Sequence, residues 1–205
     1  MNNELEQQSA PTKKEERGGF LFDALEIFVW SLAILLLLFT FVLRLCRVDG
    51  SSMENTLFDG ENLLLYSFAY EPEQDDIIVF HVTSDDSSLE KILVKRVIAT
   101  GGQTVKLDFK NNTITVDGEI YEDEHAVLKN SADMIVDRYL NFRPDWNYDA
   151  QTETMTATVP EGHLFVLGDN RNFSRDSRDS SIMFIDERCV LGKAILRISP
   201  FTVFS

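Results

Sequence analysis

The sequence predicts a mostly β protein, built from antiparallel strands behind a single N-terminal membrane-spanning helix. An uncharged run of 17 residues, from Ile27 to Leu43, is typical of a membrane span. After it, short apolar and β-branched runs alternate with turn-forming residues, and no long stretch shows helical periodicity. Apolar residues make up 44% of the 205 residues, which is enough to build a core and excludes a wholly disordered chain.

The N-terminal part is expected to comprise a disordered tail, residues 1–20, and a membrane anchor, residues 21–45. At about 1.5 Å per residue the uncharged run is about 25 Å long, at the short end for a bilayer core of about 30 Å. Two alternatives stay open, a buried core helix and a cleaved secretory signal. A cleaved signal would end at small residues, whereas Arg44-Leu45-Cys46-Arg47 follows here. The basic residues on the two sides of the span barely favour a cytoplasmic N-terminus.

The rest of the chain is predicted to form an antiparallel sandwich or a partly closed barrel. Pairs such as Asp59-Gly60, Asn111-Asn112 and Asp117-Gly118 are typical of hairpins and loops. We assign residues 46–118 and 159–205 to the core and the less regular residues 119–158 to a smaller insertion. The predicted strands are 61–66, 76–82, 92–98, 104–109, 113–116, 154–159, 163–167 and 190–198.

Charge and cysteine content argue against several classes of protein. A net charge of −15 argues against a nucleic-acid partner, because binding phosphates requires clustered lysine and arginine. Two cysteines, Cys46 and Cys189, are too few for a disulfide framework or a four-thiolate metal site. The chain has no Gly-rich phosphate loop, no Gly-x-Ser-x-Gly and no His-Glu-x-x-His, and its three histidines are scattered. We predict no metal, no cofactor and no nucleic acid.

Ser52 is the first candidate for chemistry, because it lies directly after the span and follows the small residues Gly50 and Ser51. Such residues let the backbone turn closely and expose a hydroxyl. A plain loop, or a serine that caps a helical turn, is the alternative.

Lys95 is the second candidate, because it lies inside the apolar strand 92–98. It shares a face with Leu93 and Val97 while Arg96 points the other way, so one of the two charges must face the interior. Burial lowers the pKa of a lysine, and a neutral amine can act as general base toward a serine hydroxyl. An ordinary edge-strand charge is the alternative.

The third candidate is the segment from Gly168 to Arg178, which follows the predicted strand 163–167. Its dense alternation of short polar and charged residues suits a hydrogen-bonded loop. Asp176 and Arg178 can pair with each other, and Ser174 can donate to a nearby amine. A solvated turn is the ordinary explanation.

In this order, behind one anchor, the three segments resemble type I signal peptidases, the Ser/Lys proteases that remove secretory signals. The family pattern around the nucleophile, Ser-Met-x-Pro-Thr-Leu, is matched by residues 52–57, except that Asn55 replaces the proline. The boxes at 76–80 and 95–98 also match, although the turn after the second differs from the usual Gly-Leu-Pro-Gly-Asp. Residues 168–178 match Gly-Asp-Asn-Arg-x-x-Ser-x-Asp-Ser-Arg at every fixed position.

The resemblance implies a role for each matching residue. Ser52 would be the nucleophile, with its N–H helping to bind the oxyanion, and Lys95 the general base. Ser174 would orient the Lys95 amine. Asp176 and Arg178 would hold the loop, with Asp169 and Arg171 structural.

The family cuts after small residues in an Ala-x-Ala pattern, with the substrate bound as an extended strand. By position, the pocket next to the scissile bond would be lined by Met53, Leu57, Leu93 and Val94, and a second pocket by Val48, Leu63 and Val79, with Val94 shared.

Family membership further implies a mostly β protease domain of signal-peptidase type with a small variable insertion. The protein would be a single-pass protein of the plasma membrane, with its N-terminus in the cytoplasm and its catalytic domain outside. Its partners would be the lipid bilayer and secretory preproteins. Ser52 lies nine residues after Leu43, so the nucleophile would stand close to the membrane. Activity is expected to be highest at alkaline pH, because a general-base lysine must be neutral.

Two other functions remain open. A self-cleaving Ser/Lys regulator of related fold is disfavoured by the anchor next to Ser52. A catalytically silent, membrane-tethered β scaffold of the secretion machinery is kept open by Asn55, because losing the proline removes a φ constraint just after the nucleophile.

Overall fold

The structure is a computed structural model that describes residues 13–82, 92–122, 124–126, 147–179 and 181–204. The chain divides into two compact units, Met1–Val42 and Leu43–Ser205. We call the second of these the β unit.

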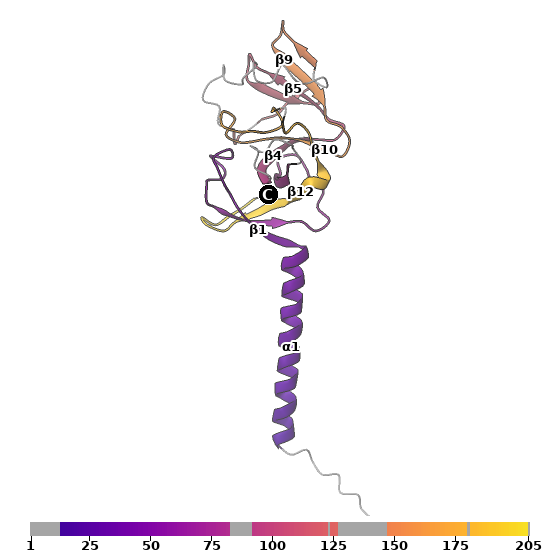
Figure 1. The fold of residues 1–205 in the computed structure, drawn as a ribbon, viewed down its shortest axis with the longest axis vertical. Coiled ribbons are helices and arrows are strands. Elements are labelled where there is room, and N and C mark those ends of the chain that lie inside the picture. Colours follow the sequence, from indigo (N-terminus) through magenta and orange to yellow (C-terminus); the bar gives the residue numbers. More distant parts are fainter. Residues whose placement is uncertain (1–12, 83–91, 123, 127–146, 180, 205) are drawn as a thin grey trace, which may run out of the picture. The chain divides into compact units, whose positions relative to one another are not determined.

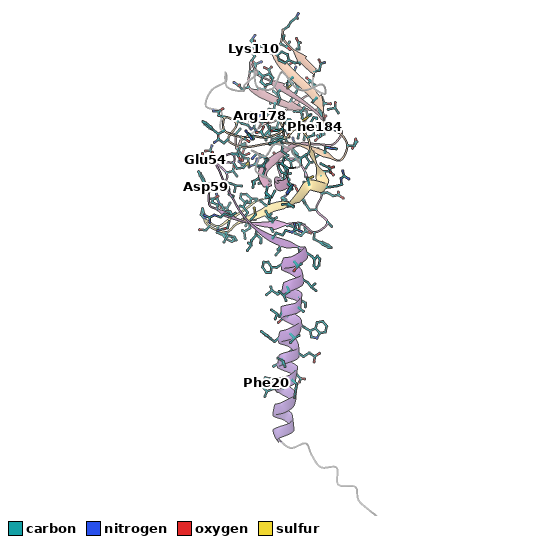
Figure 2. The ribbon with its side chains drawn as sticks, viewed as in Figure 1. Phe20, Glu54, Asp59, Lys110, Arg178 and Phe184 are labelled. Atoms are coloured by element: carbon teal, nitrogen blue, oxygen red, sulfur yellow. The ribbon has the colours of Figure 1, made fainter. Side chains whose placement is uncertain are left out.

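The first unit contains one long helix, α1 (Lys13–Phe41). Within it, the 23 residues of Gly19–Phe41 are long and apolar enough to cross a membrane, and they span about 35 Å at 1.5 Å per residue. Apolar side chains project from this stretch on all sides (Figure 2), as expected for a helix surrounded by lipid. The helix begins inside the segment predicted as a disordered tail, because lysine, glutamate and arginine are good helix formers. It ends at Phe41, so residues 43–45 of the predicted anchor belong to a strand instead.

The β unit is built mainly on one antiparallel sheet, whose strands lie in the order β1-β2-β12-β3-β4-β10-β11, with β13 paired to β12. This arrangement confirms the predicted mostly antiparallel β fold class. A short 3₁₀ helix, η2 (Glu187–Cys189), precedes β12. The strands are β1 (Leu43–Arg47), β2 (Asn62–Tyr66), β3 (Ile77–His81), β4 (Ile92–Thr100), β10 (His163–Leu167), β11 (Ile185–Asp186), β12 (Val190–Arg197) and β13 (Thr202–Val203).

A second, five-stranded sheet has the order β7-β6-β5-β9-β8. Its strands are β5 (Thr104–Asp108), β6 (Thr113–Val116), β7 (Glu119–Ile120), β8 (Asn147–Asp149) and β9 (Thr154–Thr158). The sheet is therefore larger than the predicted insertion 119–158, because the β5–β6 hairpin belongs to it. In Figure 1, β5 and β9 form a layer distinct from that of β4, β10 and β12. A buried apolar cluster joins the layers, with Val105 and Leu107 on one side and Ile98 and Phe165 on the other.

Strand β4 changes its neighbour along its length. Residues Ile92 to Arg96 pair with β3, whereas Arg96 to Thr100 pair with β10. Among the described residues, Ile92, Leu93 and Val94 have no strand on the β10 side. Both faces of β4 are covered, because Leu93 and Val97 pack in one buried cluster and Val94 in another.

Candidate active site

Ser52 and Lys95 lie in direct hydrogen-bond contact. The Lys95 amine, Nζ, donates to Ser52 Oγ at 2.7 Å and to the carbonyl oxygen of Val94 at 2.8 Å. Lys95 is only 1% exposed, while Ser52 is half-buried. The fold thus brings together a hydroxyl and an amine that are 43 residues apart in the chain.

Ser52 stands at the start of a tight turn. The amides of Thr56 and Leu57 both donate to the carbonyl oxygen of Met53, at 3.0 and 2.8 Å. Met53 and Leu57 are fully buried in the apolar cluster beneath the turn. Asn55, within the turn, has a positive φ of 74°. The turn is therefore anchored in the core on both sides of Asn55.

The loop that follows β10 holds this turn from the other side. The Asn170 amide donates to the carbonyl oxygen of Ser52 at 3.1 Å, and its side-chain Nδ2 donates to that of Ser51 at 3.0 Å. The hydroxyl of Thr56 donates to Asp169. Gly168 approaches so closely that an added Cβ would fall far inside van der Waals contact with the Ser174 hydroxyl and the Ser52 carbonyl oxygen.

A buried ion pair joins this loop to β4. Arg96 Nε and Nη2 donate to the two carboxylate oxygens of Asp169 at 3.0 and 2.8 Å, and Nη1 donates to the carbonyl oxygen of Asp75 at 2.9 Å. Arg96 is 4% exposed and Asp169 is fully buried. The sequence predicts that one charge of the Lys95–Arg96 pair faces the interior, but both are buried, because core clusters cover both faces of β4.

A second buried pair braces the loop itself. Arg178 Nε and Nη2 donate to the two oxygens of Asp176 at 2.8 and 2.9 Å, and Arg178 Nη2 also reaches the carbonyl oxygen of Arg171 at 2.7 Å. Burial opposes ionisation of Asp176, but the charge and hydrogen bonds of Arg178, with the Gly168 N–H, hold its pKa below the usual value. Burial, helped by the nearby charge of Arg178, lowers the pKa of Arg171 to about 10, so its guanidinium stays charged at neutral pH.

The Ser174 hydroxyl is buried close to Gly168. Within the described part of the chain it has no hydrogen-bond partner. The structure therefore does not contain the expected hydrogen bond from Ser174 to the Lys95 amine. The role assigned to Ser174 stays a prediction.

A cleft of about 400 Å³ opens on the Ser52–Lys95 pair. Four of the predicted pocket residues line it, namely Val48, Met53, Leu93 and Val94. The other three, Leu57, Leu63 and Val79, are fully buried in the core cluster and do not line it. A larger cleft of about 610 Å³ is lined in part by Asn55, Thr56 and Arg96, but not by Ser52 or Lys95.

Comparison with known proteins places the chain in a family. The family model described as signal peptidase, peptidase S26, matches residues 21–199. The chain belongs to the signal peptidase family. It is a type I signal peptidase, a membrane-associated serine peptidase that removes signal peptides, and this confirms the resemblance found in the sequence motifs.

Two relatives agree with the family assignment, and one solved structure is also similar in sequence. Signal peptidase IB of Staphylococcus aureus (strain COL) is 30% identical over 190 residues, which cover 87% of this chain and 93% of the relative. The probable signal peptidase I-1 of a Synechocystis strain is 30% identical over 188 residues, which cover 88% of this chain and 84% of the relative. A crystal structure of a signal peptidase I from Enterococcus faecalis V583 is 27% identical, covers 60% of this chain and 97% of that chain, and gives a TM-score of 0.39.

Several residues that line the cleft beside Ser52 and Lys95 were not predicted. Cys46, Arg47, Asp49 and Ile92 also line the cleft. No pattern in the sequence marks them, because their position depends on how β1 and β4 are placed in the folded sheet. The burial of Arg96, by contrast, could have been predicted from the sequence, since it shares its face of the strand with the apolar residues Val94 and Ile98.

The described residues contain no group of three or more histidine, cysteine, aspartate or glutamate side chains placed to hold a metal ion. None of the three histidines lines the cleft that contains Ser52 and Lys95.

Proposed function

We propose that this signal peptidase cleaves preproteins with Ser52 as nucleophile and Lys95 as general base. The observation that carries the proposal is the 2.7 Å contact between Nζ and Oγ, at a cleft of about 400 Å³. Burial of Lys95 supports it, since a lysine shielded from water gives up its proton more readily than an exposed one.

In the first half of the reaction, the neutral Lys95 amine takes the proton from Ser52 Oγ while that oxygen attacks the scissile carbonyl carbon. The tetrahedral oxyanion accepts a hydrogen bond from the Ser52 N–H. Among the described residues this N–H donates to no other acceptor, which leaves it available. The protonated amine then gives its proton to the leaving nitrogen as the C–N bond breaks, and the acyl group stays on Ser52.

In the second half, water attacks the acyl ester and Lys95 accepts its proton. Collapse of the new tetrahedral intermediate releases the carboxylic acid, which ionises by losing its proton to water, and Ser52 Oγ regains a proton from Lys95. Apart from this water, the proposed reaction uses only side chains and amides of the chain itself.

The supporting residues would keep this geometry. Asp169, held by Arg96, accepts from Thr56, while Asp176 and Arg178 hold the loop whose Asn170 fixes the Ser52 carbonyl. Arg171, whose Nε donates to the Gly168 carbonyl oxygen at 3.0 Å, would be structural. Ser174 would orient the Lys95 amine in the substrate complex.

The substrate would bind as an extended strand along Ile92 to Val94, where β4 has no neighbouring strand on the β10 side among the described residues. The lining beside Ser52 is apolar, through Val48, Met53, Leu93 and Val94, and this supports specificity for small residues in an Ala-x-Ala pattern. Leu57, Leu63 and Val79 would shape the pockets from behind, within the core cluster.

Gly19–Phe41 would anchor the protein in the plasma membrane, with the N-terminus in the cytoplasm and the β unit outside. A preprotein that is held in the bilayer by its own signal segment would then meet the β unit on the side where mature proteins are released.

The test is cleavage of a preprotein carrying an Ala-x-Ala site by the full-length chain in detergent, alongside Ser52→Ala and Lys95→Ala. We expect the parent to cut after the last alanine and both variants to be inactive. Lys106→Ala, at an exposed lysine of β5, is the matched control and should keep activity. Cleavage by Lys95→Ala would show that the base is another group. A parent inert on several preproteins would favour the scaffold function.

A further inference from the structure

We propose that Asn55 is a positioning residue for catalysis, and that its left-handed backbone conformation sets the location of Ser52. The inference rests on the proposed role of Ser52. Asn55 is the third residue of the four-residue turn from Met53 to Thr56, which is closed by the Thr56 amide on the Met53 carbonyl. Its φ of 74° lies in the region that β-carbon sterics disfavour, and asparagine and glycine are the residues that most readily adopt it.

The turn links two anchor points on one loop. Before Asn55, the Ser52 carbonyl accepts from the Asn170 amide; after it, the Thr56 hydroxyl donates to Asp169. Arg197 Nη1 also donates to the Thr56 carbonyl at 3.0 Å. Because Asp169 and Asn170 are adjacent, the span between the two anchors is fixed. The turn must have the right shape to place Ser52 Oγ at 2.7 Å from Lys95 Nζ.

Asn55 is also where the chain departs from the family motif, which has proline at this position. Proline is restricted to a φ of about −65° and cannot adopt the conformation seen here. The replacement is therefore not a simple loss of rigidity. This chain closes the turn with a different backbone, and asparagine is suited to it. A change to the family residue should damage the site rather than improve it.

The experiment compares Asn55→Gly, Asn55→Ala and Asn55→Pro in the full-length chain in detergent. Glycine adopts positive φ freely, alanine does so with strain, and proline cannot. We expect kcat to stay within about threefold of the parent for glycine, to fall about tenfold for alanine and at least about a hundredfold for proline. KM should change little, because Asn55 does not line the cleft that contains Ser52.

Asn112→Ala is the matched control. Asn112 has a φ of 53° in the β5–β6 hairpin, so alanine there introduces similar backbone strain away from the site. Both alanine variants should lower the thermal midpoint, but only Asn55→Ala should lower kcat. The proposal would be overturned if Asn55→Pro had the same kcat as the parent. It would also be overturned if Asn55→Ala and Asn55→Gly lost kcat equally.

Amide hydrogen exchange gives a readout that does not depend on activity. The Thr56 and Leu57 amides both donate to Met53, so they should stay protected in Asn55→Gly and lose protection in Asn55→Pro. Retained protection in the proline variant would also overturn the proposal. If Ser52→Ala still cleaved, the proposed nucleophile would be wrong, while exchange at these two amides would still decide whether Asn55 sets the turn.

Discussion

The buried Arg96–Asp169 pair allows a quantitative test of how the site is held. Its side chains are 5% and 0% exposed, and two hydrogen bonds of 3.0 and 2.8 Å join them. Removing one partner of such a pair costs about 3–5 kcal/mol, because the other charge stays buried without compensation. Asp169→Asn keeps the shape of the side chain and some of its hydrogen bonds, so we expect the free energy of unfolding to fall by about 3 kcal/mol. Arg96→Met leaves the Asp169 carboxylate with fewer donors, so we expect the free energy of unfolding to fall by about 5 kcal/mol.

Urea unfolding of the full-length chain, followed by near-ultraviolet circular dichroism, measures these losses. The double variant Arg96→Met/Asp169→Leu should recover to within about 2 kcal/mol of the parent, because two apolar side chains replace two buried charges. Its cleavage activity should nevertheless stay low, since Thr56 has lost its acceptor. A loss below about 1 kcal/mol for Asp169→Asn would refute the reasoning, as would a double variant as unstable as Arg96→Met.

Three further predictions concern the same region. Gly168→Ala should lower the free energy of unfolding, measured with urea, by about 1–3 kcal/mol, because the added methyl group overpacks the site. It should also lower kcat for peptide cleavage by up to about a hundredfold. A kcat equal to that of the parent would contradict the close approach of Gly168 to Ser174 and to the Ser52 carbonyl oxygen. The pKa of Asp176 is lowered in the folded state, so the ionised carboxylate stabilises the fold. This stabilisation is complete above about pH 4, the ordinary range of an aspartate pKa, and is lost as the pH falls through the folded-state pKa. Between pH 5 and 3 the parent should therefore lose more stability than Asp176→Asn, whereas equal slopes would show that this carboxylate is not the cause. Burial raises the pKa of the Cys46 thiol, so in a Cys189→Ala background iodoacetamide should react slowly at neutral pH and faster at higher pH. A peptide bound in the cleft should slow that reaction, and no protection would mean that it binds elsewhere.

The sequence was sufficient to predict the fold class, and its resemblance to type I signal peptidases pointed to Ser52 and Lys95 as a pair. Alternation along 92–98 shows which residues share a face, and turn-forming pairs show where strands end. These are local patterns, and the strands that they predict are short-range features of the chain.

The remaining features depend on contacts between distant segments. Thr56 and Asp169 are 113 residues apart, and no periodicity relates them. The positive φ of Asn55 follows from the two ends of its turn being held by the core and by the loop after β10, not from its neighbours in the sequence. The extent of the second sheet was missed because the β5–β6 hairpin looks like any other hairpin until its partner β9 is known.

The change of neighbour along β4 limits how far an added strand can pair with it. A peptide that pairs with Ile92 to Val94 cannot continue along β4, because from Arg96 onward that position is occupied by β10. Among the described residues, Lys95 lies between the part of β4 that has no neighbour on this side and the part that pairs with β10. In the proposed complex the peptide would leave the sheet beside this lysine, so the position of β10 would determine which bond is presented to Ser52.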